Sequence, residues 1–160
     1  MIFALISNLQ DDNIIYREGD KTPDFKLKQI NKNNEMDYVQ LSELEGKGVM
    51  LNFWATWCKP CESEMPYMQA LYPTYKEKGV EIIAISLDST ELVINQFIDK
   101  YDITFPIPHD KTKEIRDLYK VGPIPSSFFI DANGEIKRVV MGELSLSRLE
   151  GYLDEIVPDG

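Results

Sequence analysis

The sequence contains little that could bind a metal ion or cross-link the chain. Among its 160 residues are two cysteines, Cys58 and Cys61, and one histidine, His109. A structural zinc site needs four ligands, usually cysteine or histidine, so zinc would have to recruit a carboxylate or a second chain. A domain of this size buries roughly 70% of its unfolded surface and needs no disulfide to hold it together. We therefore expect no metal and no cofactor.

Clustered positive charge and a membrane-length apolar run are also missing. The chain carries 27 acidic and 17 basic residues, a formal net charge of -10, with no lysine- or arginine-rich run. Nucleic-acid binding needs such a cluster, so we expect no nucleic-acid partner. The apolar start, MIFALISNL, covers residues 1–9, less than half of the roughly 20 residues that cross a bilayer. It is either the end of a longer anchor or a segment that packs on the domain.

The remaining sequence alternates strand and helix patterns. Two nearly continuous apolar runs, residues 49–55 and 80–88, are typical of strands covered on both faces. Between them, apolar side chains at 3-4-3 spacing predict a helix over residues 61–78. The other predicted elements are a hairpin within 25–41, helices at 91–101, 115–119 and 146–156, and a hairpin of 126–131 with 135–141. This order predicts an α/β sandwich around a mixed sheet.

Two boundaries follow from turn and capping residues. The segment QDDNIIYREGDKTPDF is mostly polar with Gly19 and Pro23, which is typical of a linker. We therefore divide the chain into residues 1–18, an N-terminal apolar segment and linker, and residues 19–160, a single domain. Within this domain, Ser42 and Glu45 have the spacing of a capping box, which predicts a brief helix.

The two cysteines lie two residues apart in FWATWCKPCESEMP, residues 53–66. A disulfide across so short a gap removes little chain entropy, which makes it a poor staple. If a helix starts around Cys58, its sulfur lies at the positive end of the helix dipole, which favours the thiolate. Cys61, one turn further, could then attack a mixed disulfide, and Pro60 suits the first helical turn. This arrangement favours redox exchange over a passive disulfide, two buried thiols or a zinc site.

The surroundings of the pair resemble the thioredoxin superfamily. The resemblance rests on WCKPC after an apolar strand, on Pro66 in the helix, and on IPSSFFID followed by a hairpin. It extends from about Gly19 to the C-terminus. The N-terminal hairpin, GKGVMLNFWATWC and the extra segment near residues 88–117 resemble the extracytoplasmic reductases of the ResA and TlpA type. This resemblance implies a thioredoxin-like sandwich with an added N-terminal hairpin, a thiol-disulfide oxidoreductase, and an extracytoplasmic protein that is membrane-anchored at full length.

The resemblance also implies roles for individual residues. Pro125 matches the cis-proline that faces the disulfide, where it would present the backbone of Ile124 to an extended partner. Glu64 matches a glutamate that tunes the thiols. Its spacing from Cys61 puts both on one helical face, and burial would raise its pKa toward neutrality. Asn52 stands where the common thioredoxin pattern has a buried aspartate, so that proton-transfer task must fall elsewhere or be absent.

We also expect roles for the residues next to the cysteines. Trp57 is expected beside the disulfide as part of a substrate-binding surface, together with Lys59 and Pro60 between the cysteines. A cation at Lys59 would favour the thiolate and select acidic partners. Glu62 and Glu64 could equally be surface charges in the first helical turns, where the dipole favours acids.

The implied substrate is a protein disulfide, with the haem-attachment cysteines of apocytochrome c as the suggested case and a membrane thiol carrier as electron donor. No residue specifies that partner, and the acidic surface is compatible with a monomer. A thiol peroxidase is one alternative, because TPDFKL and LSELEGKGVML resemble the start of the peroxiredoxin fold. However, Leu51 and Ala55 stand where the peroxiredoxin pattern P-x-x-x-T-x-x-C has proline and threonine. A disulfide-forming oxidant and a binding module without turnover are further alternatives.

Overall fold

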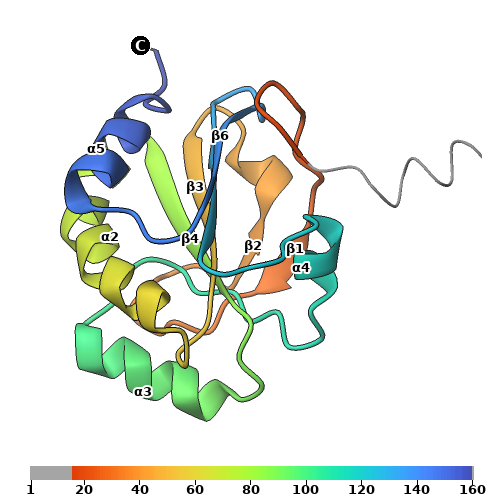
Figure 1. The fold of residues 1–160 in the computed structure, drawn as a ribbon. Helices are drawn as coiled ribbons and strands as arrows, with labels where there is room; N and C mark the ends of the chain where they lie inside the picture. Colours follow the sequence, from red (N-terminus) through yellow and green to blue (C-terminus); the bar gives the residue numbers. More distant parts are fainter. Residues whose placement is uncertain (1–15, 160) are drawn as a thin grey trace, which may run out of the picture.

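A four-stranded mixed sheet forms the centre of the molecule (Figure 1). The computed structural model describes residues 16–159. The strands, in their order across the sheet, are β4 (Val80–Ser86), β3 (Gly48–Trp54), β5 (Ser126–Ile130) and β6 (Ile136–Met141). β3 and β4 are parallel, whereas β5 is antiparallel to β3 and β6 is antiparallel to β5. The predicted mixed sheet is therefore confirmed.

Within residues 16–159, four α-helices pack around this sheet, close to the predicted positions. They are α2 (Lys59–Glu77), α3 (Glu91–Tyr101), α4 (Glu114–Leu118) and α5 (Leu146–Asp154). Helix α2 joins the parallel strands β3 and β4, which makes the expected βαβ unit. It is followed by Gly79, whose positive φ of 88° suits glycine in the turn into β4. At the other end of the chain, the Ser145 hydroxyl caps α5 by accepting a hydrogen bond from the Arg148 N–H at 3.3 Å.

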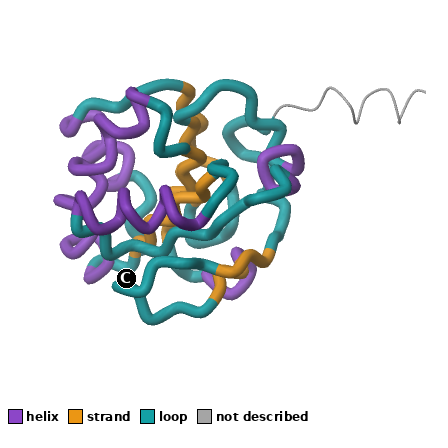
Figure 2. Tube along the Cα trace, turned by 90° about the horizontal axis from the view of Figure 1, so that it is seen from below, coloured by secondary structure: helices purple, strands orange, loops and turns teal. Residues whose placement is uncertain are grey.

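The side chains of β3 alternate between two apolar cores. Met50 and Trp54 belong to the core under α2, α3 and α5, while Leu51 and Phe53 belong to the core under the N-terminal hairpin and α4. Figures 1 and 2 show how the helices are layered on the sheet, with the longer helices on one side of the strands. Because a strand has a period of two residues, Asn52 lies on the same face as Met50 and Trp54. This alternation directs a polar amide toward α2.

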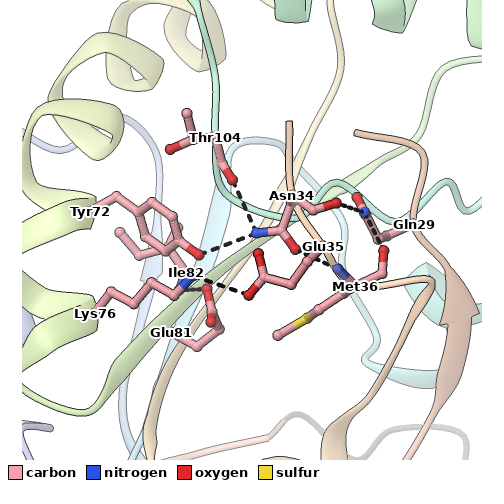
Figure 3. A network of polar contacts seen from close by, with 9 residues as sticks. All are labelled: Gln29, Asn34, Glu35, Met36, Tyr72, Lys76, Glu81, Ile82 and Thr104. Carbon is pink, nitrogen blue, oxygen red and sulfur yellow. Dashed lines mark hydrogen bonds and ion pairs between the residues drawn. The ribbon is translucent and has the colours of Figure 1, made fainter. Parts of the chain in front are cut away.

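The predicted N-terminal hairpin is confirmed, and buried amides fasten it to the domain. Its strands are β1 (Lys26–Lys28) and β2 (Tyr38–Gln40). In the loop between them, the Asn31 side chain donates to the carbonyls of Ile103 and Phe105 at 2.9 and 2.8 Å. Asn34 donates to the carbonyl of Thr104 at 3.0 Å (Figure 3). The hairpin loop thus satisfies backbone carbonyls of a segment far along the chain.

The capping box expected at Ser42 and Glu45 is wrong. A short 3-10 helix, η1 (Leu41–Leu44), begins there after Gln40, without a side-chain cap. The Ser42 N–H instead donates to the Asp24 carboxylate at 2.8 Å. Asp24, 18 positions earlier, therefore takes the Ser42 N–H that a capping box would pair with the Glu45 side chain.

The predicted N-terminal segment, residues 1–18, is described only from Tyr16 onward, so the apolar run at 1–9 lies outside the described residues. The chain meets the sheet where the Gly19 N–H donates to the Ile136 carbonyl at 2.7 Å. The ring of Tyr16 lies 6.0 Å from that of Tyr119, measured between centroids. Within residues 16–159, no helix has both the length and the apolarity to span a membrane. The division between residues 18 and 19 stays a prediction.

Candidate active site

The cysteines lie where β3 leads into α2. Cys58 is the N-cap of the helix, and its Sγ accepts a hydrogen bond from the Cys61 N–H at 3.3 Å. Pro60 occupies the first turn, as predicted. The two cysteines form a disulfide, in which Cys58 is 6% exposed and Cys61 1% exposed. Cys58 thus combines the positive end of the helix dipole with the greater exposure of the two.

A cis peptide bond joins Ile124 to Pro125, as the resemblance predicted. The Cys58 Sγ lies 3.8 Å from the Ile124 carbonyl oxygen. A disulfide sulfur has no hydrogen to donate, so this is a close contact here, and a Cys58 thiol could donate to the same oxygen. The Gly142 N–H donates to the Pro125 carbonyl at 2.8 Å. The bend at Pro125 is therefore held by the segment after β6.

Asp88 holds the turn before the cysteines, a role that was not predicted from the sequence. It follows β4 and accepts hydrogen bonds from the Thr56 N–H at 3.0 Å and the Thr56 hydroxyl at 2.7 Å. The Ser86 hydroxyl adds a third at 2.8 Å. The carboxyl ends of the parallel neighbours β3 and β4 lie at the same edge of the sheet, so the acid at the end of the second apolar run was a usable signal.

The residues expected to contact a substrate are exposed around the disulfide. Trp57 is 71% exposed, and both Lys59 and Pro60 are exposed on the first turn of α2. Met141, which pairs with Ser126 next to the cis-proline, is 68% exposed. Trp57 and Met141 are therefore two exposed apolar side chains on segments that adjoin the disulfide and the cis-proline, and substrate binding by the predicted residues stays a prediction.

Glu64 lies one turn after Cys61 on α2 and is 1% exposed. Its Oε2 accepts a hydrogen bond from the Leu144 N–H at 2.7 Å, and its Oε1 accepts one from the Asn52 amide at 3.3 Å. Burial raises the pKa of Glu64 to about 7, although both hydrogen bonds lower it. Glu64 is therefore not a surface charge, and its carboxyl group can exchange a proton near neutral pH.

Glu62, by contrast, fits the surface interpretation. Its carboxylate accepts a hydrogen bond from the Tyr101 hydroxyl at 2.8 Å and lies 3.6 Å from the Lys100 ammonium. The Tyr101 hydrogen bond holds the pKa of Glu62 below its ordinary value. Glu62 therefore stays ionised and connects α2 to α3.

Asn52 connects Glu64 to the sheet. Its side-chain nitrogen also donates to the Ser127 hydroxyl on β5 at 3.0 Å. Its side-chain oxygen is the one buried side-chain nitrogen or oxygen atom without a hydrogen-bond partner in the described part of the chain. Asn52 was predicted as a departure from the thioredoxin pattern, but neither of its contacts was predicted from the sequence.

No metal-binding constellation competes with this interpretation in residues 16–159, where no three histidine, cysteine, aspartate or glutamate side chains are grouped to hold an ion. The Nε2 of His109 lies 2.7 Å from the Asp88 carbonyl, to which it donates.

Comparison with known proteins agrees with this chemistry. The model of the AhpC/TSA family matches residues 18–139. The chain is 65% identical over 158 residues to the thiol-disulfide oxidoreductase ResA of Oceanobacillus iheyensis, with 99% of this chain and 82% of that protein covered. The chain belongs to the ResA thiol-disulfide oxidoreductases. A ResA of Bacillus cereus is 46% identical over 156 residues, covering 98% of this chain and 88% of its own.

Two solved structures share the fold of this ResA-family chain. StoA of Bacillus subtilis is 28% identical with a TM-score of 0.70, covering 81% of this chain and 96% of its own. A Chlorobium tepidum protein assigned as the thiol:disulfide interchange protein DsbE is 31% identical with a TM-score of 0.80. That match covers 89% of this chain and 99% of the other. The thioredoxin-like fold and dithiol-disulfide exchange are thus confirmed.

The peroxidase alternative is not favoured for a ResA-family chain. The matched AhpC/TSA region includes the segments that suggested it. However, Leu51 and Ala55 are both fully buried apolar residues at the positions where that chemistry uses proline and threonine. The relatives from Oceanobacillus iheyensis and Bacillus cereus are named as thiol-disulfide oxidoreductases.

Proposed function

We propose that this protein reduces protein disulfides outside the cytoplasm, with Cys58 as the attacking nucleophile and Glu64 as the proton acceptor for Cys61. One observation carries the proposal. The Cys58–Cys61 disulfide lies at the start of α2, with the buried Glu64 one turn behind it and cis-Pro125 beside it. This arrangement provides a nucleophile, a resolving thiol and a titratable group in one place.

The reaction runs from the dithiol form. The Cys58 thiolate attacks one sulfur of the substrate disulfide, which forms a mixed disulfide and expels the other substrate sulfur as a thiolate. The Cys61 thiol passes its proton to the Glu64 carboxylate and attacks the Cys58 sulfur. The second substrate thiolate leaves, and the Cys58–Cys61 disulfide remains. Two electrons pass from the protein to the substrate, whose thiolates take up protons from solvent.

The proposed substrate is an extended polypeptide, with the haem-attachment cysteines of apocytochrome c in cytochrome c maturation as the specific candidate. Exposed Trp57 and the Ile124 backbone beside the disulfide support an extended partner that lies across the site. A membrane thiol carrier would return the disulfide to the dithiol form. The extracytoplasmic, membrane-anchored setting and this partner rest on the resemblance to the ResA and TlpA type. We expect the domain to act as a monomer.

The reduction potential of the cysteine couple tests the direction of electron flow. Equilibration with glutathione or dithiothreitol, followed by Trp fluorescence, should give a value near or below about -250 mV, as for a reductant. A value near about -120 mV would instead indicate a disulfide-forming oxidant. Absence of a reversible couple would contradict the exchange activity itself.

A further inference from the structure

Asn52 has an arrangement that a purely structural role does not explain. It is fully buried on β3, and its side-chain nitrogen donates both to Glu64 on α2 and to Ser127 on β5. Its side-chain oxygen has no partner in the described part of the chain. A buried polar atom without a partner costs about 1–3 kcal/mol. This orientation of the amide therefore destabilises the folded protein unless the contacts of its nitrogen compensate.

The protonation state of Glu64 supplies a reason. A carboxylate only accepts hydrogen bonds, whereas a carboxylic acid must also donate one. The Oε2 of Glu64 faces the Leu144 N–H, a backbone donor that cannot become an acceptor. The acid proton is therefore best placed on Oε1, which faces the Asn52 nitrogen. That nitrogen can donate a hydrogen bond to the carboxylate, but it cannot accept one from the O–H of the acid.

The amide can serve both states by turning over. Half a rotation of the Asn52 side-chain amide exchanges its nitrogen and oxygen, so that the carbonyl accepts from the protonated Glu64. The Ser127 hydroxyl can donate as well as accept, so it can follow the change. In either orientation one end of the amide lacks a partner, so the choice between orientations rests with Glu64.

We propose that Asn52 is a positioning residue whose side-chain amide turns over as Glu64 gains or loses its proton. This proposal rests on the role given to Glu64 above, because Asn52 acts on the cysteines only through that carboxyl group. An aspartate at this position would place two acids together, and the pair would share one proton. Asparagine gives Glu64 a partner in both protonation states without adding a second charge.

The groups that face Glu64 are few. Glu143, in the segment after β6, raises the pKa of Glu64 by repulsion, and the cysteines lie on the same helix as Glu64. β3 and β5 contribute the uncharged Asn52 and Ser127. In the disulfide form the cysteines do not titrate, so the oxidised protein isolates the behaviour of Glu64 and Asn52.

Nuclear magnetic resonance of the oxidised wild-type protein tests the turnover directly. The Glu64 carboxyl carbon shift gives the midpoint of its titration. Well above this midpoint, we expect nuclear Overhauser effects from the Asn52 side-chain amide protons to the Ser127 β-protons. Well below it, these effects should disappear because the carbonyl then faces Ser127. The same pattern at both pH values would overturn the proposal.

An Asn52→Asp variant provides a second test with little change in shape. Its carboxyl group should raise the proton affinity of Glu64 by roughly tenfold or more, because the buried pair retains one proton to higher pH. The matched control, Ser127→Ala, keeps the contact between Asn52 and Glu64 and should move the midpoint much less. An unchanged Glu64 midpoint in Asn52→Asp would contradict the proposal. The wild-type measurement remains decisive if this variant does not fold.

A Glu64→Gln variant separates this inference from the function on which it rests. In that variant the Asn52 contacts should no longer depend on pH, and a persisting dependence would show that another group drives the amide. If Glu64→Gln leaves the pH profile of disulfide exchange unchanged, the proposed role of Glu64 in exchange fails. In that case a turnover observed in the wild type would still establish the coupling of Asn52 to Glu64.

Discussion

Glu62 and Glu64 are separated by one residue on the same helix, yet their carboxyl groups bind protons with opposite tendencies. Tyr101 stabilises the ionised form of Glu62, whereas burial disfavours the ionised form of Glu64. The two positions lie on different sides of α2, one facing α3 and one facing the sheet. At the scale of single residues, partners and burial rather than residue type decide which acid can gain or lose a proton near neutral pH.

The pKa of Glu64 makes stability depend on pH. Because its folded pKa of about 7 exceeds the ordinary 4.5, the folded protein binds the extra proton between these values. Its stabilising contribution is thus full below the ordinary pKa and is lost as the pH rises through the folded pKa. Between about pH 5 and about pH 8, the free energy of unfolding of oxidised wild type should fall by about 2 kcal/mol more than that of Glu64→Gln.

Urea denaturation of both proteins at the two pH values measures this difference. Glu81 is also buried with a raised pKa, but it is present in both proteins, so its contribution cancels in the comparison. Parallel pH dependences in the two proteins would contradict the interpretation of Glu64 as a proton-binding group.

At the scale of elements, the segment between α3 and α4 depends on the N-terminal hairpin. Ile103, Phe105 and Ile107 in this segment are buried, but they belong to no helix and to no strand of the central sheet. Three carbonyl groups of this segment are satisfied by amide side chains from the hairpin loop. The hairpin is therefore part of the domain's support and not an appendage.

This dependence predicts the effect of removing one amide. Asn31→Ala leaves the Phe105 carbonyl without the Asn31 amide as its partner, while the Ile103 carbonyl keeps a hydrogen bond from Asn33 at 3.1 Å. We expect the free energy of unfolding to fall by about 2 kcal/mol. Urea titration measures this change, and the exposed neighbour Lys32→Ala should stay within about 0.5 kcal/mol of wild type. Equal stability of the two variants would show that water replaces these bonds.

The elements and the cysteine site were predictable because their signals are local. The spacing of Cys58, Cys61 and Glu64 lies within one helix, and the strand patterns lie within single runs. The contact of Asn52 with Ser127 joins residues 75 positions apart, so it depends on how β3 pairs with β5. The Leu144 N–H is a backbone donor, which leaves no residue-specific signal in a sequence.

Long-range contacts also account for the prediction that failed. The spacing of Ser42 and Glu45 suits a capping box, but Asp24 approaches from β1's side of the hairpin and takes the Ser42 N–H. In the same way, Asp88 after β4 accepts a hydrogen bond from Thr56 after the neighbouring strand β3. Both contacts depend on tertiary structure, which overrides local capping preferences.

At the scale of the whole molecule, the charge of the chain opposes the charge nearest the disulfide. The net charge of -10 attracts cationic partners, whereas exposed Lys59 between the cysteines favours anionic ones. Salt separates the two influences, since screening lengths are about 30 Å at 0.01 M and about 8 Å at 0.15 M. At low salt the charges of the whole surface act on an approaching substrate, and at high salt only the charges close to the disulfide do.

We therefore expect a disulfide peptide with lysine flanks to be reduced several-fold faster than one with glutamate flanks at about 0.01 M salt. The difference should shrink at about 0.15 M. Stopped-flow Trp fluorescence with both peptides measures the rates, and Lys59→Ala should increase the preference for lysine. A preference for glutamate at low salt would show that Lys59 outweighs the overall charge.

The hydrogen bond between Gly19 and Ile136 has a practical consequence for orientation. It lies at the end of the sheet where β3 begins, whereas the disulfide follows the end of β3, about 20 Å of strand away (Figure 1). A fusion partner or a solid support joined ahead of Tyr16 would therefore be attached at the end of the sheet opposite the disulfide. The disulfide would then lie on the side away from the attachment, where a substrate polypeptide can reach it.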